Sequence, residues 1–260
     1  MTSAIQSDYL VLMGPLFRPE IKNIWQESLQ KVKSQGTKII FLGIASIRYE
    51  EEYMSIYRDF LKSVQLYLLV SRDTETYIKL GEYAQHANNG IDLAFFIPGY
   101  YKLIGLENLN PYVVLNFDKS LEPKIKILQN TTLTPVNKKN EEIFNFEGNT
   151  WEIQPDKWRT KIARKSRYLM FLESIIFNGE QTRLIGNYDI IRTDHHYAPI
   201  IKQGPFRYPN VMVNDTPFPY FEVYGNAKLI LSNRLHACVI GLSYGNLVML
   251  FSESPRLRLI

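Results

Sequence analysis

The chain has 260 residues, enough for two small domains or one large one. Hydrophobic residues make up 45% and charged residues 22%, which excludes an intrinsically disordered protein. The net charge of +4 comes without a basic tract interleaved with aromatic residues, so nucleic-acid binding is not expected. A mild positive excess of this kind suits an anionic small ligand or work close to a membrane.

Membrane-spanning and secreted proteins are not expected either. The single cysteine, Cys238, excludes an internal disulfide and fits a reducing compartment. The longest apolar stretches, such as residues 66–70, have the length of a strand and fall far short of the roughly 20 residues of a spanning helix. No signal-peptide core follows Met1. We therefore expect a cytoplasmic protein, with the inner face of the membrane as the alternative place.

The first part of the chain alternates short apolar runs with amphipathic segments. Each run has the length of a strand, and each amphipathic segment has apolar residues at helical spacing. Near-continuous apolar strands separated by helices are typical of a parallel sheet covered on both faces, and hence of an α/β fold. The expected strands are residues 8–13, 38–43, 66–70 and 91–97, and the expected helices are residues 19–33, 49–62 and 74–85.

The second part repeats this pattern after a polar insertion. We expect an N-terminal domain over residues 1–109 and a C-terminal domain over residues 110–260, with the insertion at about 118–155. This layout predicts two Rossmann-like domains that face each other across a cleft. The N-terminal one is expected to be incomplete, because it has four strands and no glycine-rich βα turn. Expected elements are strands 112–117, 188–192, 211–213, 227–231 and 247–251, a hairpin of 143–146 with 150–153, helices 156–177 and 237–242, and a helical turn at 220–224.

The most informative motif is residues 232–236, Ser-Asn-Arg-Leu-His. It follows the expected strand at 227–231 and precedes the expected helix at 237–242, so Arg234 and His236 lie at a strand-to-helix junction. Such junctions lie at the carboxyl edge of a parallel sheet, where open α/β folds bind ligands, and the amides of a helix start attract anions. An arginine that can bind a carboxylate or phosphate, beside a histidine that can transfer a proton, predicts an anion-handling site.

A second group of polar residues follows the strand expected at 188–192. It consists of Asp194, His195 and His196. Adjacent histidines point in different directions, and no other metal ligands are obvious nearby, so residues at the rim of a substrate site are favoured over metal ligands. No metal is expected.

Two further segments have simple structural interpretations beside the functional ones. Arg72 and Asp73 follow the third expected strand, which would make Asp73 a helix cap and Arg72 either a surface charge or an anion ligand. Residues 220–224, Tyr-Phe-Glu-Val-Tyr, suit aromatic packing or a platform for stacking sugars, and packing is the simpler interpretation.

One familiar pattern is misleading. Residues 241–245 match the Gly-x-Ser-x-Gly elbow of hydrolases around Ser243, but that elbow turns from a strand into a helix. Here the pattern ends a helix, and neither an aspartate nor a histidine follows Ser243 in the chain.

Cys238 lies in the same expected helix and is interpreted as a small core residue. Glycine-rich nucleotide loops, Cys-x-x-Cys, His-Glu-x-x-His and Asp-x-Asp are all missing from the sequence.

Several segments resemble the polysaccharide pyruvyl transferase family. They occur in the order of the family and span most of the chain. Each segment alone is modestly specific, and it is the set that carries the resemblance; the Arg-Leu-His of the family matches Arg234, Leu235 and His236. The resembling segments are residues 69–77, 90–96, 190–195, 220–227 and 232–238.

The resemblance implies both a fold and a reaction. The fold is the two-domain arrangement of the GT-B glycosyltransferases. The reaction is transfer of a pyruvyl group, as a ketal, from phosphoenolpyruvate to sugar hydroxyls of a surface polysaccharide or glycan precursor. Phosphoenolpyruvate is the donor substrate, so no cofactor is implied, and the acceptor is a sugar or a lipid-linked oligosaccharide.

The resemblance also implies residue roles. His236 would be the general acid that protonates the enol carbon. Arg234 and Arg72 would hold the carboxylate and the phosphate, with Leu235 in the same substrate site. Three further residues are candidates for deprotonating or positioning the acceptor: Asp194, His195 and Asp92.

The chain departs from the family at its N-terminus. The usual Asn-x-Gly-Asp strand-loop-helix is missing, and the first expected strand leads instead into residues 13–16, Met-Gly-Pro-Leu. Two other functions stay open, the first from the similarity of fold and the second from the missing N-terminal segment. One is a glycosyltransferase that uses a nucleotide sugar, and the other is a non-catalytic remnant that binds glycans.

Overall fold

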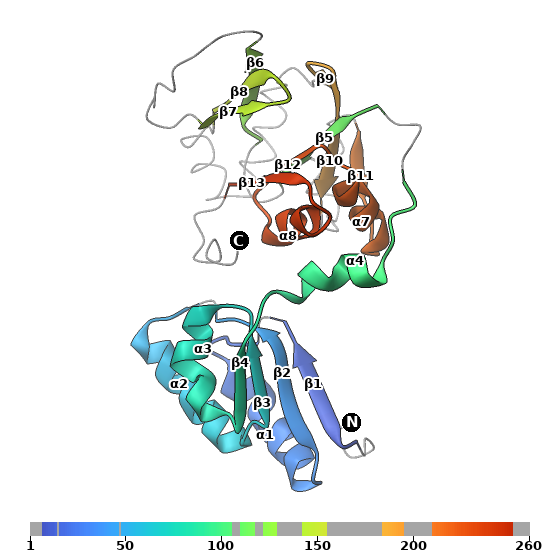
Figure 1. Cartoon of the computed structure of the whole chain (residues 1–260). Helices are drawn as coiled ribbons and strands as arrows, with labels where there is room; N and C mark the ends of the chain where they lie inside the picture. Colours follow the sequence, from blue (N-terminus) through green and yellow to red (C-terminus); the bar gives the residue numbers. More distant parts are fainter. Residues whose placement is uncertain are drawn as a thin grey trace, which may run out of the picture. The chain divides into compact units, whose positions relative to one another are not determined.

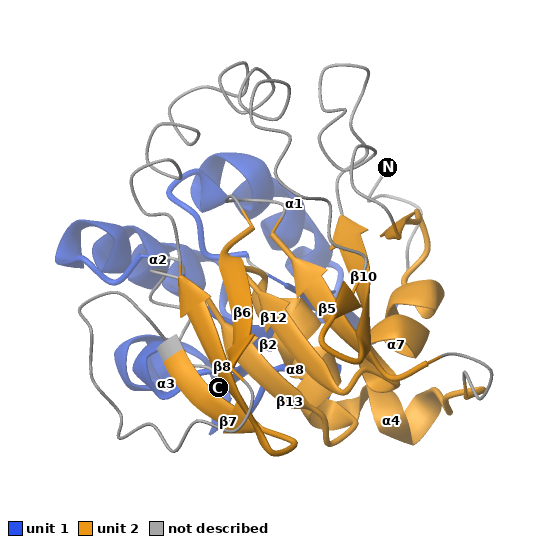
Figure 2. Cartoon of the chain, turned by 90° about the horizontal axis from the view of Figure 1, so that it is seen from above, with its two compact units in different colours: residues 1–95, 254–260 blue, residues 96–253 orange. Residues whose placement is uncertain are grey.

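The chain forms two compact units in a computed structural model (Figures 1 and 2). The described residues up to Phe95 belong to unit 1, and those from Phe96 onward belong to unit 2. Among the described residues, no helix is long and apolar enough to cross a membrane. The structure describes residues 7–14, 16–46, 48–105, 110–117, 122–128, 142–154, 184–194 and 210–251.

Unit 1 is built on a parallel sheet with the strand order β1-β2-β3-β4 (Figure 1). The first three strands and the three helices were predicted from the sequence. The strands are β1 (Tyr9–Met13), β2 (Lys38–Ile44), β3 (Leu68–Ser71) and β4 (His86–Asn89), and the helices are α1 (Ile21–Ser34), α2 (Glu51–Val64) and α3 (Thr74–Leu80).

The helices α1 and α2 cover a single face of this sheet. Ile39, Phe41 and Leu69 are buried in one cluster with the apolar sides of both helices. The opposite face is more open, since Val11 and Met13 of β1 are 46% and 62% exposed. Each crossover moves one strand along in the same direction, and right-handed crossovers then place every helix on the same side. The expectation of two covered faces is therefore not met by the described residues of unit 1.

The strand predicted at residues 91–97 was wrong. That stretch contains the 3₁₀-helix η3 (Leu93–Phe96), which runs into α4 (Ile97–Tyr100). The Asp92 carboxylate accepts a hydrogen bond from Ala94 N at 3.0 Å and starts the helical turn, and a proline lies in the first turn of α4. The fourth strand is instead β4. Three of its four side chains are exposed, so its sequence, His-Ala-Asn-Asn, does not need an apolar pattern.

Unit 2 contains a six-stranded sheet with the order β11-β10-β5-β12-β13, parallel throughout this path, and a short β9 antiparallel to β10. The mixed α/β class predicted from the sequence is confirmed. The strands of this sheet are β5 (Tyr112–Asn116), β9 (Leu184–Ile185), β10 (Tyr188–Asp194), β11 (Val211–Val213), β12 (Leu229–Ser232) and β13 (Leu247–Leu250).

Different structures cover the two faces of this sheet. The helices α7 (Phe218–Gly225) and α8 (Leu235–Ser243) pack on one face. The predicted hairpin, β7 (Glu142–Phe146) with β8 (Asn149–Gln154), packs on the other, where Trp151 is fully buried. A third strand, β6 (Lys124–Leu128), joins this hairpin although the segment was expected to be irregular. The helix predicted at residues 156–177 lies outside the described residues.

The segment that follows Phe95 groups with unit 2. Tyr101, just after α4, donates a hydrogen bond from its hydroxyl to Glu222 at 2.8 Å, and Tyr244 donates one to the Tyr101 carbonyl at 2.8 Å. The units thus divide between residues 95 and 96, whereas the domain boundary expected from the sequence lies at 109/110.

Gly241 lets α8 lie close against the sheet. A methyl group at this position would overlap Ile230 Cδ1 and lie 3.0 Å from Val248 Cγ1, both on strands beneath the helix. Gly241→Ala should therefore lower the free energy of unfolding by about 1–3 kcal/mol in thermal or urea denaturation. Adding Ile230→Val, which removes the overlapping methyl group, should recover part of the loss.

The matched control for this prediction is Gly99→Ala in α4. Nothing lies within 4 Å of the added carbon there, so the change should be neutral or stabilising. Equal unfolding midpoints for Gly241→Ala and the wild type would contradict the close packing.

Candidate functional site

A row of polar residues closes the carboxyl end of the central strands of unit 2. Thr193 of β10, Asn116 of β5 and Ser232 of β12 lie at one level of the sheet and are all buried. Asn116 Nδ2 donates to the carbonyl and hydroxyl oxygens of Thr193 at 2.8 and 3.0 Å. Ser232 Oγ donates to Asn116 Oδ1 at 3.1 Å. The ends of three neighbouring strands are thus joined through side chains.

This row lies where the strand order reverses. The connection after β5 leads to β10 on one side, whereas the connection after β12 leads through α8 to β13 on the other side. Open α/β sheets bind ligands at such a switch point, outside the carboxyl ends of the strands. Asn116 and Ser232 end the two strands that flank it.

The turn from β12 into α8 carries the motif found in the sequence. The predicted strand and helix are both present, and Arg234 is the N-cap residue of α8 with an extended backbone (φ −111°, ψ 122°). Its amide donates to Ser232 Oγ at 2.8 Å, and the amide of Asn233 donates to the Asn116 carbonyl at 2.9 Å. Arg234 and Leu235 are half-buried, while His236 is exposed in the first turn of the helix. The fold therefore brings these three predicted residues together at one helix start.

Asp194 ends β10 at the same edge of the sheet. It is buried, and its carbonyl accepts a hydrogen bond of 2.6 Å from the hydroxyl of Tyr220. Two strand spacings, or about 10 Å, separate β10 from β12 across β5, so Asp194 lies on the same edge as Arg234 but not on the same turn. His195 lies outside the described residues.

Arg72 and Asp92 lie in unit 1. Arg72 follows β3 and is buried, so its interpretation as a surface charge was wrong. Its Nη1 donates to Asp92 Oδ2 at 2.8 Å, and the two side chains are 6% and 7% exposed. The Nε of Arg72 is buried without a hydrogen-bond partner among the described residues. The expected helix cap is confirmed, because Asp73 Oδ1 accepts from Thr76 N at 2.7 Å.

Comparison with known proteins decides the family. A family model described as polysaccharide pyruvyl transferase matches residues 14–246. The chain belongs to the polysaccharide pyruvyl transferase family. Membership indicates a transferase that acts on a polysaccharide. No curated protein matches the sequence of this chain.

The family match includes every residue that was expected from the sequence to lie in a substrate site. It begins just after β1 in unit 1 and ends just before β13 in unit 2. Arg72 and Asp92 of unit 1 are therefore inside the match, as is the whole turn from Ser232 to His236. The match by itself assigns no role to any of them.

Sequence reasoning missed the polar row itself. Asn116, Thr193 and Ser232 each stand near the end of an apolar strand, in Tyr-Val-Val-Leu-Asn, Ile-Ile-Arg-Thr-Asp and Leu-Ile-Leu-Ser. A polar residue that ends a buried strand was the available signal. Tyr224 of α7 extends the row, since its hydroxyl lies 2.8 Å from Thr193 Oγ1.

The segment around Ser243 and Cys238 has the structural roles that were expected from the sequence of this family member. Ser243 is the last residue of α8, and its hydroxyl donates to the Ile240 carbonyl at 2.7 Å, so it is not on a nucleophile elbow. Gly245 follows the end of the helix with a φ of +84°, the left-handed conformation in which a glycine commonly ends a helix. Cys238 is fully buried, and this burial raises the pKa of its thiol to about 12. It is therefore a core residue and not a nucleophile.

The aromatic segment at 220–224 is mainly core. Tyr220 and Tyr224 are 4% and 0% exposed and lie with their rings 6.1 Å apart. Packing, the simpler interpretation, is confirmed for both tyrosines. Among the described residues, no group of three or more histidine, cysteine, aspartate or glutamate side chains is arranged to hold a metal ion.

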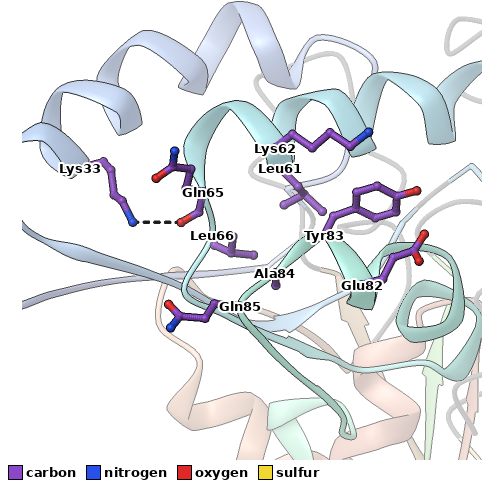
Figure 3. Close-up of a pocket in the computed structure, with 9 residues that line it drawn as sticks. All are labelled: Lys33, Leu61, Lys62, Gln65, Leu66, Glu82, Tyr83, Ala84 and Gln85. Carbon is purple, nitrogen blue, oxygen red and sulfur yellow. Dashed lines mark hydrogen bonds between the residues drawn. The ribbon is translucent and has the colours of Figure 1, made fainter.

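A hollow of about 570 Å³ lies in unit 1 at the amino ends of its strands, opposite to the end that carries Arg72 (Figure 3). It is formed where α1 and α2 end, at the amino ends of the following strands, and so lies away from Arg72. Its lysines are engaged within the fold: Lys33 Nζ donates to the Gln65 carbonyl at 3.2 Å, and Lys62 Nζ lies 5.1 Å from the centre of the Tyr83 ring.

Proposed function

We propose that this chain transfers the pyruvyl group of phosphoenolpyruvate to two hydroxyls of a sugar, forming a cyclic ketal in a surface polysaccharide or its precursor. The observation that supports this reaction best is the turn at the start of α8. In a member of this family, it presents an arginine and an exposed histidine together at the switch point of a parallel sheet.

The proposed chemistry needs a proton donor and a site for two anionic groups. A proton adds to the methylene carbon of phosphoenolpyruvate and leaves a cationic centre at the adjacent carbon. One sugar hydroxyl attacks this carbon, phosphate leaves, and a neighbouring hydroxyl closes the ketal. Both hydroxyl protons are released, and inorganic phosphate is the second product. Arginines and helix amides can stabilise the charges of the donor throughout.

We assign the proton donor and the anion ligands as follows. His236 protonates the carbon, because it is exposed at the helix start and can reach a bound ligand. Arg234 binds the donor's carboxylate or phosphate, together with the amides of the first helical turn, which lack acceptors within the helix. Leu235 contacts the donor between them, and Asp194 and His195 position or deprotonate the acceptor.

In unit 1, Arg72 is the second anion ligand of the proposal. Its guanidinium is held by Asp92, and we assign to Asp92 the role of orienting Arg72 at the end of β3. We further propose that the two units adopt the GT-B arrangement, with substrates in a cleft between Rossmann-like domains. The support is that each unit carries its candidate residues at the carboxyl end of a parallel sheet.

We also propose a cytoplasmic enzyme that needs no cofactor and reaches a lipid-linked acceptor at the inner face of the membrane. The lone, buried cysteine suits a reducing compartment. The net charge of +4 favours approach to anionic donors and to an anionic membrane surface.

The full chain tests this function directly. Phosphate release from phosphoenolpyruvate should require an acceptor, supplied as a panel of aryl hexosides with free 4- and 6-hydroxyls, and a ketal should appear by mass spectrometry. Calorimetric titration should detect binding of phosphoenolpyruvate and none of uridine, guanosine or cytidine nucleotide sugars. Binding of a nucleotide sugar without binding of phosphoenolpyruvate would support the glycosyltransferase instead.

A further inference from the structure

We infer that Asn116 is a positioning residue for this reaction, and that it sets the geometry of the turn that carries Arg234 and His236. The inference rests on the proposed function. Asn116 ends β5 and is 0% exposed, so it does not reach the substrate and acts through the neighbouring turn.

Asn116 holds two consecutive residues of that turn. Its carbonyl accepts from the amide of Asn233 at 2.9 Å. Its side-chain oxygen accepts from Ser232 Oγ at 3.1 Å, and Ser232 Oγ in turn accepts from the amide of Arg234 at 2.8 Å. Asn116 thus holds the amide of Asn233 by a direct hydrogen bond and the amide of Arg234 through the Ser232 hydroxyl.

The side-chain nitrogen of Asn116 fixes the orientation of the Asn116 amide group. Nδ2 donates to Thr193 at 2.8 and 3.0 Å, and Thr193 Oγ1 lies 2.8 Å from the hydroxyl of Tyr224. A buried side chain at this place must donate toward β10 and accept from β12 at the same time. Asparagine does both while neutral, whereas an ionised aspartate only accepts.

This difference makes Asn116→Asp an informative variant, because its fit depends on pH. Burial raises the pKa of a carboxyl group. A neutral carboxylic acid in this place donates and accepts like the amide, whereas its ionised form loses the donor and adds a buried charge. Among the described residues, two titratable groups contact the neighbours of Asn116: the hydroxyl of Tyr224 lies 2.8 Å from Thr193 Oγ1, and the thiol of Cys238 interacts with Ser232.

We expect the turnover of Asn116→Asp to fall at least about tenfold below the wild type near pH 8.5 and to recover toward it near pH 6. Dividing by wild-type turnover at each pH removes every pH dependence that the two proteins share. The loss should be in kcat more than in KM. Folding is verified by circular dichroism at each pH, since a merely structural role would leave the kcat of the folded molecules unchanged.

A second readout does not need turnover. The amides of Asn233 and Arg234 should exchange their hydrogens faster in Asn116→Asp at high pH than at low pH, after correction for the intrinsic rate. Asn145→Asp is the matched control, because Asn145 is exposed on β7 and accepts a hydrogen bond from Thr150, which a carboxylate can also do. It should show neither effect.

The outcomes separate the two proposals. If the wild type lacks turnover with phosphoenolpyruvate, the proposed function fails, and the exchange measurement still decides the positioning role. Wild-type kcat and exchange in Asn116→Asp across the pH range would overturn the inference. If that variant does not fold, Ser232→Ala removes the hydroxyl between Asn116 and Arg234, and unchanged protection of the Arg234 amide would overturn it equally.

Discussion

Replacing His236 by glutamine should lower kcat for phosphate release by a factor of about 10²–10⁴ while leaving phosphoenolpyruvate binding largely intact. Glutamine keeps much of the size and polarity of the side chain but cannot deliver a proton to carbon. Arg234 and the first-turn amides of α8, which bind the donor in our proposal, remain in place. Turnover is measured by phosphate release, and donor affinity by calorimetry.

Isotope labelling makes this prediction specific for the proton transfer. In deuterium oxide the methyl group of the ketal formed by the wild type should carry one deuterium, because the third hydrogen comes from the enzyme and exchanges with solvent. His86→Gln is the matched control, since His86 is an exposed histidine on β4 of unit 1 and should have no effect. Wild-type turnover in His236→Gln would assign the proton to another donor.

The secondary structure around the site could be predicted because its signals are local. The apolar run before Ser232 and the apolar helix after Leu235 mark a strand and a helix wherever they occur in a sheet. By contrast, β4 escaped prediction, because its residues are mostly polar and exposed although backbone pairing with β3 holds them in the sheet. Local polarity is a weak guide for a strand at the end of a sheet.

The hydrogen bonds within the polar row and the buried ion pair could not be predicted, because they depend on pairing between distant segments. Asn116 meets Ser232 only because β5 and β12 are neighbours, and they are 116 residues apart in the chain. Arg72 and Asp92 meet because the chain returns through β4 to the same end of the sheet. The residue types were visible in the sequence, but the strand order that brings them together was not.

Removing the carboxylate of the buried ion pair should destabilise unit 1 strongly. Asp92→Ala leaves the guanidinium of Arg72 buried without its partner, and such a change typically costs about 3–5 kcal/mol of the free energy of unfolding. The Nε of Arg72 already lacks a described partner, so little else compensates. Urea denaturation followed by circular dichroism measures the loss. The control is Asp59→Ala, which breaks an exposed pair with Lys22 and should cost at most about 1 kcal/mol.

A double replacement separates stability from function at this pair. Arg72→Met with Asp92→Leu removes both charges together, and apolar side chains of similar volume should restore most of the stability lost in Asp92→Ala. If Arg72 binds the anionic donor, this double variant should be folded and yet bind phosphoenolpyruvate much more weakly than the wild type. A stable double variant with wild-type donor affinity would make the pair purely structural and would leave Arg234 as the anion ligand. Loss of stability in both variants would instead show that the pair is needed for the packing between β3 and the turn before η3.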